Sequence, residues 1–117
     1  MTQYMLLIYA QEADQPKPNT PEAGAMVDAY GSFTKEIHDN GQFKAGDALM
    51  PVGTATTVQV RDGKVLTTDG PFAETKEQLG GYYLVEAKNL DEALATAAKI
   101  PTAKHGSIEV RPVMVWE

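Results

Sequence analysis

The sequence predicts an α+β fold in which two helices cover one face of a β-sheet. Apolar segments of strand length alternate with two amphipathic helical segments, and these signals follow the order β-α-β-hairpin-β-α-β. This is the order of a split βαβ, or ferredoxin-like, unit with an added β-hairpin. The sequence contains no internal repeat or low-complexity tract, so residues 1–117 are expected to form a single domain.

The first part of the chain predicts a strand, a helix and a second strand. Residues 3–10 form a nearly continuous apolar run, which is typical of a central strand. A polar loop without regular structure is expected over 11–19. Residues 20–22 are threonine, proline and glutamate, a pattern typical of a helix start, and Asn-Gly at 40–41 ends the helix. Residues 43–49 predict the second strand. The apolar stripe of the helix consists of Met26, Val27, Tyr30, Phe33, Thr34 and Ile37.

The middle of the chain predicts a hairpin followed by a constrained corner. Two strand-like segments, 54–60 and 64–68, flank Asp62-Gly63, a dipeptide that favours a tight hairpin turn. The tetrapeptide Asp69-Gly70-Pro71-Phe72 comes next. Proline has a fixed φ and restricts the residue before it towards extended geometry, so the aspartate is expected at a rigid corner. Loops on a rigid scaffold commonly carry function.

The last part of the chain predicts a strand, a helix and a final strand. Gly80-Gly81 indicates a bulge or a close backbone approach beside a strand over 82–87. Asn89 and Glu92 form a capping pair for a helix over 90–100. The final strand is expected over 107–116, and its proline indicates a sheet edge or a bulge. The side chains expected to face inward are Leu90, Ala93, Leu94 and Ala97 in the helix and Ile108, Val110, Val113 and Val115 in the strand.

Composition excludes several classes of function. The net charge is −6 and the ten Lys and Arg residues are scattered, so no nucleic-acid partner is expected. The absence of cysteine excludes disulfides and thiolate chemistry. Two distant histidines, His38 and His105, have no metal-ligand spacing, so neither a metal nor another cofactor is expected. The first apolar run is too short for a membrane span or a signal peptide, which predicts a cytoplasmic protein without a membrane partner.

The predicted sheet has one face without a cover. Residues 5–9 and 82–85 are apolar on both sides of their strands, and two helices cover only one side. A second copy of the chain would cover the other side. We therefore expect a homodimer.

Three further segments accompany the Asp-Gly-Pro-Phe corner: residues 4–9, 74–83 and 109–114. On these residues nearly the whole chain resembles the YCII-related family, in its DGPF-domain branch. The resemblance implies a dimeric α+β barrel built from the sheets of two protomers. In the other branch of this family, a first-helix histidine and an aspartate are the proposed catalytic pair. The nearest position here is Tyr30, so that chemistry is not carried over.

Asp69, Glu74 and Lys76 are the candidate catalytic residues. Asp69 at its corner can act as a general base or a polar anchor, and Glu74 and Lys76 share one face if their segment is extended. Structural alternatives stand beside each role. The Asp69 carboxylate can instead accept backbone N–H groups and fix the turn, and Glu74 with Lys76 can form a solvated rim.

The candidate ligand-binding residues are Tyr9, Tyr30, Gly70, Pro71 and Tyr82. The three tyrosines can offer hydroxyl groups to a ligand. Their structural alternative is a core position with a hydrated hydroxyl.

Two functions remain open. The first is a small-molecule enzyme or binding protein that works in a cleft of the dimeric barrel, with proton transfer on a small organic acid or lactone as the expected reaction. The alternative is a non-catalytic regulatory or interaction module, because members of the family occur joined to or beside transcription sigma factors. The two are distinguished by whether Asp69, Glu74 and Lys76 meet in one pocket. Whether the protein is an enzyme stays open.

Overall fold

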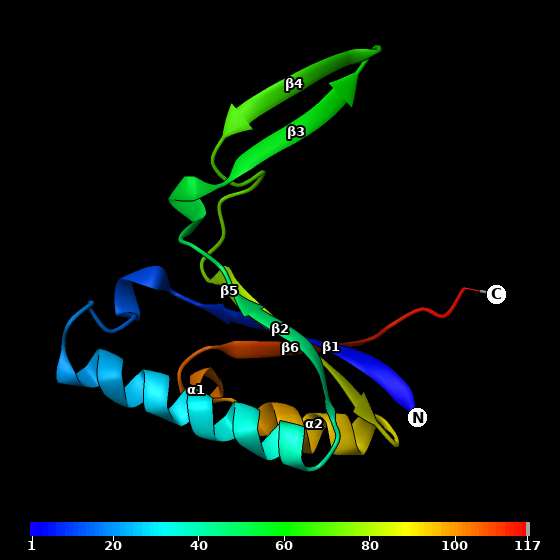
Figure 1. Ribbon diagram of the computed structural model, residues 1–117. Coiled ribbons are helices and arrows are strands. Elements are labelled where there is room, and N and C mark those ends of the chain that lie inside the picture. Colours follow the sequence, from blue (N-terminus) through cyan, green and yellow to red (C-terminus); the bar gives the residue numbers. More distant parts are fainter. Residues whose placement is uncertain (117) are drawn as a thin grey trace.

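The computed structural model describes residues 1–116 and shows a four-stranded sheet with both helices on one face (Figure 1). The sheet order is β2-β5-β1-β6, and every neighbouring pair of strands is antiparallel. This α+β arrangement is compatible with the predicted ferredoxin-like fold. The elements of this body are β1 (Thr2–Ala10), α1 (Pro21–Asp39), β2 (Phe43–Ala48), β5 (Gln78–Ala87), α2 (Leu90–Ala98) and β6 (Ser107–Pro112).

The remaining elements are short or stand apart from the sheet. β3 (Thr56–Arg61) and β4 (Lys64–Asp69) form the predicted hairpin as a separate two-stranded sheet. Three 3₁₀ turns complete the described part of the chain: η1 (Glu12–Asp14), η2 (Val52–Thr54) and η3 (Pro101–Lys104). The turn η1 lies in a loop that was expected to have no regular structure, so that expectation is wrong over three residues.

Local sequence signals fix the ends of both helices. The Thr20 hydroxyl accepts the Ala23 N–H at 3.2 Å, and the Asn89 side chain accepts the Glu92 N–H at 3.0 Å. Gly41 has a φ of +81° just after α1, a conformation that glycine adopts without a Cβ penalty. These caps confirm the predicted helix starts and the end of the first helix.

The core lies between the sheet and the helix layer. Alternate residues of β1 and β5 face the helices and are buried, and Phe33 and Ile37 of α1 pack against them. The core consists of Tyr4, Leu6, Ile8, Phe33, Ile37, Tyr83, Val85, Ala87, Ala93, Ala97 and Ile100, with Tyr30, Phe43, Ile108 and Val110 packed against it.

Four residues expected to face inward are exposed instead. Val27 in α1 is 70% exposed, and Leu90 and Leu94 in α2 are 48% and 46% exposed. Each helix therefore contacts the sheet through a narrower stripe than its apolar pattern predicts. Val115 is 79% exposed because β6 ends at Pro112, before the residue is reached.

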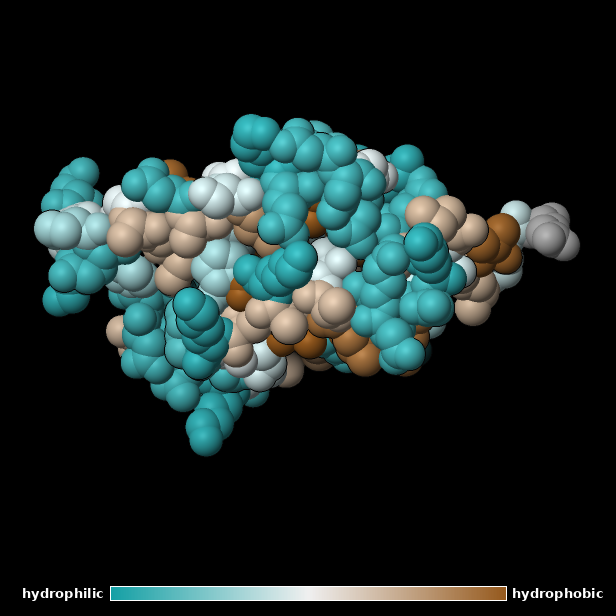
Figure 2. All heavy atoms as spheres, turned by 90° about the horizontal axis from the view of Figure 1, so that it is seen from below, coloured by the Kyte–Doolittle hydropathy of each residue, from teal (hydrophilic) through white to brown (hydrophobic). Residues whose placement is uncertain are grey.

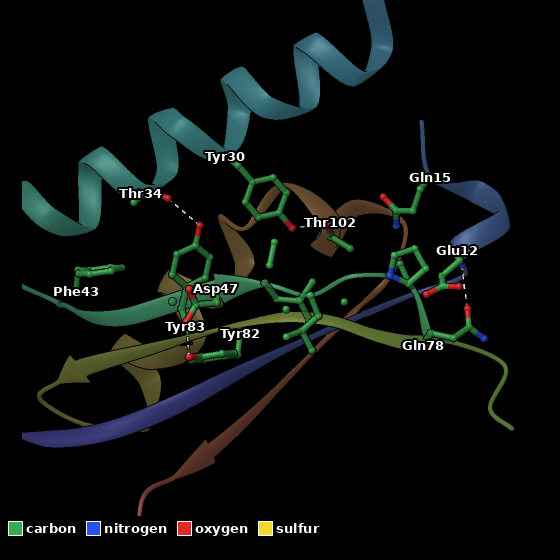
Figure 3. A pocket seen from close by; sticks show the side chains of 18 residues that line it. Glu12, Gln15, Tyr30, Thr34, Phe43, Asp47, Gln78, Tyr82, Tyr83 and Thr102 are labelled. Atoms are coloured by element: carbon green, nitrogen blue, oxygen red, sulfur yellow. Dashed lines mark hydrogen bonds between the residues drawn. The ribbon is translucent and has the colours of Figure 1, made fainter. Parts of the chain in front are cut away.

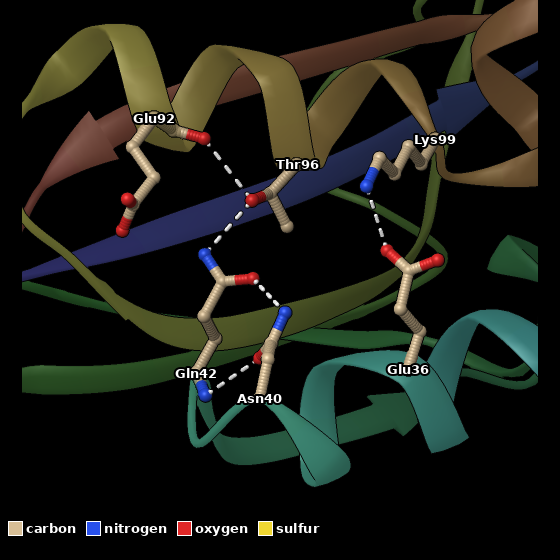
Figure 4. A network of polar contacts seen from close by, with 6 residues as sticks. All are labelled: Glu36, Asn40, Gln42, Glu92, Thr96 and Lys99. Carbon is tan, nitrogen blue, oxygen red and sulfur yellow. Dashed lines mark hydrogen bonds and ion pairs between the residues drawn. The ribbon is translucent and has the colours of Figure 1, made fainter.

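A polar network joins the C-terminal end of α1 to α2 within the helix layer (Figure 4). The buried Gln42 side chain donates to the Thr96 hydroxyl at 2.9 Å, and Thr96 donates to the Glu92 carbonyl at 3.0 Å. Asn40 holds the other end of the Gln42 amide at 2.8 Å. Because each of these polar atoms has a partner, the network costs little to bury and fixes the spacing of the helices.

The opposite face of the sheet has no cover within residues 1–116. Met5, Leu7, Tyr82 and Leu84 on this open face are half-buried by their neighbours alone. Figure 2 views the molecule from the helix side, where the surface is mostly hydrophilic. The helix layer thus faces solvent, whereas the open face presents apolar side chains.

The hairpin of β3 and β4, residues 56–69, projects away from the body and is called the arm below (Figure 1). Asp62 and Gly63 at its tip have φ values of 51° and 75°, as a type I′ turn requires. The arm rises on the side of the sheet away from the helices.

None of the helices in residues 1–116 combines the length and the apolar character needed to cross a bilayer.

Candidate functional site

A pocket of about 490 Å³ lies between α1 and the sheet, near the ends of β1, β2 and β5 (Figure 3). Its walls come from α1, η3, the helix-facing side of the sheet and the loops that lead to the arm. The lining residues are Ile8, Ala10, Glu12, Gln15, Tyr30, Thr34, Phe43, Gly46, Asp47, Ala48, Leu49, Pro51, Gln78, Gly80, Gly81, Tyr82, Tyr83 and Thr102. A largely apolar wall with a few polar groups is typical of small-molecule sites.

Two hydroxyl pairs lie side by side in the pocket. The Tyr30 hydroxyl shares a hydrogen bond with the Thr102 hydroxyl at 2.5 Å, and the Thr34 hydroxyl shares one with the Tyr83 hydroxyl at 2.7 Å. Figure 3 shows both pairs, with Tyr30 and Thr34 reaching down from α1. Each pair uses one of its two O–H protons, so the second proton is available to a ligand oxygen.

The Tyr83 ring forms part of the pocket wall and is held from two sides. Its centroid is 5.1 Å from that of Phe33 and 6.4 Å from that of Phe43, both in edge-to-face geometry. Gly46 lies against the ring: a Cβ at this position would be 2.7 Å from Tyr83 Cδ1. The ring can therefore occupy this position only because residue 46 has no side chain.

A set of hydrogen bonds around Glu12, called the brace below, holds the rim of the pocket. The Glu12 carboxylate accepts the Val52 N–H at 2.8 Å, and the Glu12 N–H donates to the Gln78 side-chain oxygen at 2.9 Å. The Gln78 amide group donates to the Thr75 carbonyl at 2.7 Å. The brace therefore ties η1 to η2 and to the start of β5, the two places where the chain leaves for the arm and returns from it.

The pocket is acidic at its edges and otherwise uncharged. Among the described residues, its lining includes Glu12 and Asp47 but no Lys, Arg or His, and the Asp47 carboxylate accepts from Tyr82 on the open face. Burial raises the pKa of Tyr30 above its usual value, although the Thr102 bond opposes this. The hydrogen bond from Tyr82 to the Asp47 carboxylate, at 2.7 Å, raises the pKa of Tyr82. Both phenols are neutral near pH 7; the Tyr82 proton is used in its bond to Asp47, whereas the Tyr30–Thr102 pair keeps one O–H proton for a ligand.

Of the predicted ligand-binding tyrosines, Tyr30 and Tyr82 line this pocket and Tyr9 does not. Tyr82 points to the open face beside Asp47, because its neighbour Tyr83 faces the helices. Tyr9 lies on the open face, where its hydroxyl is 3.4 Å from the Glu109 carboxylate. Burial, and then the Glu109 charge, raise the pKa of Tyr9.

The structure does not bring Asp69, Glu74 and Lys76 into the pocket. Asp69 ends β4 in the arm, and Glu74 and Lys76 lie in the segment that leads to β5. All three residues are exposed. Gly70 and Pro71, which were predicted to bind a ligand, are likewise outside the lining. The roles assigned to these five residues stay predictions.

The corner at Gly70 is fixed by its own backbone. The Gly70 N–H donates to the Ala55 carbonyl at 2.7 Å, and the Thr57 hydroxyl donates to the Gly70 carbonyl at 2.8 Å. Within residues 1–116, no hydrogen bond reaches the Asp69 carboxylate. The φ of Gly70 is +96°, so the extended geometry expected before Pro71 is wrong. Glycine can adopt this φ because it has no Cβ.

Sequence reasoning missed most of the polar groups that line the pocket. Thr34 and Tyr83 were assigned only to the apolar patterns of a helix and a strand, and Glu12 and Thr102 lie in turns without a motif. The sequence held one signal for Thr102: Pro101 ends the second helix, so the residue after it begins the turn that leads back to the sheet. No group of three or more metal-binding side chains occurs in the part of the chain that is described.

Comparison with known proteins gives a consistent result over the whole chain. The model of the YCII-related domain family matches residues 2–117. A protein of Rhizobium meliloti (strain 1021), described as uncharacterized, is 33% identical over 116 residues. The match covers 97% of this chain and 94% of that protein.

Proposed function

We propose that this chain, which belongs to the YCII-related domain family, binds a small and largely apolar organic molecule in the pocket under α1. The observation that carries the proposal is the cavity of about 490 Å³ with two hydroxyl pairs beside an apolar wall. Such a volume lies within the range of small-molecule sites, and its few polar groups can orient a ligand.

The charges of the lining favour an uncharged ligand over the organic acid expected from the sequence. A carboxylate buried in the pocket would have no cation to pair with among the described residues, and Glu12 at the rim would repel it. The free O–H protons of the two hydroxyl pairs match an acceptor oxygen instead. A ketone, ester or lactone carbonyl on an apolar body meets both requirements.

A fluorescent probe tests this proposal. N-phenyl-1-naphthylamine is uncharged, largely apolar and brighter in an apolar site, so titration with the protein measures its affinity. Cyclohexanone and cyclohexanecarboxylate then compete for the site as a matched pair that differs in charge. We expect the ketone to displace the probe and the carboxylate to have little effect.

Two tryptophan variants locate the binding site. Leu49 lies at the pocket and is 48% exposed, and Leu94 lies on α2 and is 46% exposed. Leu49→Trp fills the mouth of the pocket, and we expect it to weaken probe binding at least about tenfold. Leu94→Trp adds the same group to a surface of similar exposure and should leave probe binding unchanged. Equal binding by the two variants would place the probe elsewhere and overturn the proposal.

We also propose that the open face pairs with the open face of a second copy, which would form the predicted dimeric α+β barrel. The described chain exposes 8309 Å², whereas a compact monomer of this size exposes about 6,200 Å². Its radius of gyration is 16.2 Å, against about 13 Å for a compact domain of this length. The surplus area exceeds the roughly 800 Å² per partner of a standard interface, which supports a homodimer.

A further inference from the structure

The two faces of the arm differ in character. Val58, Val60 and Val65 share one face, because residues paired across a hairpin point to the same side and Val60 pairs with Val65. Gln59, Arg61 and Lys64 lie on the other face, where Leu66 is the one large apolar residue and is 46% exposed. The three valines are 60%, 58% and 68% exposed, so this valine face has no cover in the described chain.

An arm with these properties is poorly stabilised on its own. A two-stranded hairpin is marginally stable in water without a surface to pack on. The arm shares no strand pairing with the four-stranded sheet, and its own backbone ladder and type I′ turn are its main internal support. Packing the valine face against another surface would supply the missing stabilisation.

The position of the arm indicates which surface that is. The arm rises on the same side of the sheet as the open face, opposite the helices (Figure 1). A protein packed on the open face would therefore stand beside the arm. The surplus surface of the chain includes both features, and a standard dimer interface accounts for less than half of it.

We propose that the arm packs its valine face onto a second copy of this chain. The arm of each protomer then contacts the other protomer across a two-fold axis, an arrangement called the clasp below. The inference rests on the homodimer proposed above and adds a second contact region to it. Arg61 and Lys64 lie on the opposite face of the arm, so both charges can stay in water when the valine face is packed.

Sedimentation equilibrium across a range of protein concentrations measures the contribution of the arm. In Val60→Lys a charge replaces an apolar side chain on the valine face, and in Gln59→Lys the same residue is placed on the opposite face of the same strand. We expect Val60→Lys to raise the dimer dissociation constant at least about tenfold and Gln59→Lys to leave it within about twofold. Equal dissociation constants for the two variants and the wild type would overturn the role of the arm while leaving the dimer intact.

Thiol reactivity gives a second readout that does not depend on affinity. Because the chain has no cysteine, Val60→Cys and Gln59→Cys each introduce a single thiol. Above the dimer dissociation constant, we expect the thiol at 60 to react with a maleimide at least about tenfold more slowly than the thiol at 59. Dilution to the monomer should remove the difference.

Two outcomes would overturn the inference in distinguishable ways. A wild-type chain that sediments as a monomer at every concentration would overturn both the homodimer and the clasp. A thiol at 60 that stays protected in the monomer would mean that the arm folds back onto its own chain. The pocket proposal is tested separately by the two tryptophan variants, so neither result decides it.

Discussion

Replacing Gly106 with alanine should destabilise the protein through a direct backbone clash. Gly106 lies between η3 and β6, and a Cβ at this position would be 2.2 Å from the Tyr9 carbonyl oxygen. It would also be 2.9 Å from the Thr102 methyl group. The carbonyl belongs to the central strand β1, so it cannot rotate away without disturbing the pairing of Tyr9 with Ser107.

The size of the effect follows from the displacement that the clash requires. The Cβ and the carbonyl must separate by about 1 Å to reach an ordinary contact. Overpacking typically costs about 1–3 kcal/mol, and weakening the 2.7 Å bond from the Gly106 N–H to the Thr102 carbonyl adds about 1 kcal/mol. A loss of about 2–4 kcal/mol corresponds to a fall in Tm of about 8–16 °C for this chain length.

Urea and thermal unfolding at one fixed protein concentration measure this loss. Gly31→Ala in α1 is the matched control, because nothing lies within 4 Å of its Cβ position. Alanine is the better helix former, so this control should gain about 0.5–1 kcal/mol. A Gly106→Ala protein whose Tm lies within about 2 °C of the wild type would refute the steric reasoning.

Three further predictions address the pocket and the corner. Tyr30→Phe should lower the free energy of unfolding by about 1–3 kcal/mol, because it leaves the buried Thr102 hydroxyl without its partner. Adding Thr102→Val should recover part of this loss, and additive losses in the double-mutant cycle would contradict the coupling of the two hydroxyls. Because burial raises the pKa of Tyr30 above 10.0, the contribution of this residue to stability is complete below about pH 10 and is lost as the pH rises through the folded-state pKa. The urea midpoint should therefore fall more steeply above about pH 10 for the wild type than for Tyr30→Phe. Parallel plots of urea midpoint against pH for the two proteins would contradict this prediction. Gly70→Val should lower the free energy of unfolding by about 1–3 kcal/mol, because a β-branched residue is strained at a φ of +96°. An unchanged Tm would show that the corner adopts another conformation.

Local signals predicted most of the fold because each acts within a few residues. Thr20 and Asn89 bind backbone N–H groups three residues ahead, and Asp62-Gly63 sets the hairpin turn regardless of the rest of the chain. The extent of burial was harder to predict. Val27 and Leu94 follow the helical period, but they lie at the margin of each apolar stripe and stay exposed.

The pocket could not be predicted because its polar groups are far apart in sequence. Tyr30 and Thr102 are 72 residues apart, and only the packing of η3 against α1 brings their hydroxyls together. Asp69 had the stronger local signal, but it ends β4 at the root of the arm and lies outside the pocket lining. The Gly-Pro pair therefore predicted a corner, but it predicted neither the positive φ of Gly70 nor where the corner would lie.

The brace around Glu12 makes the root of the arm mechanically part of the pocket rim. Each strand of the arm has six residues, so the arm acts as a lever of about 20 Å. A rotation of about 10° at Val52 and Gln78 would move the tip by about 3.5 Å. If the arm packs on a second copy as proposed above, a ligand that shifts the brace would change the strength of that contact. Linkage then requires the partner to change ligand affinity by the same factor.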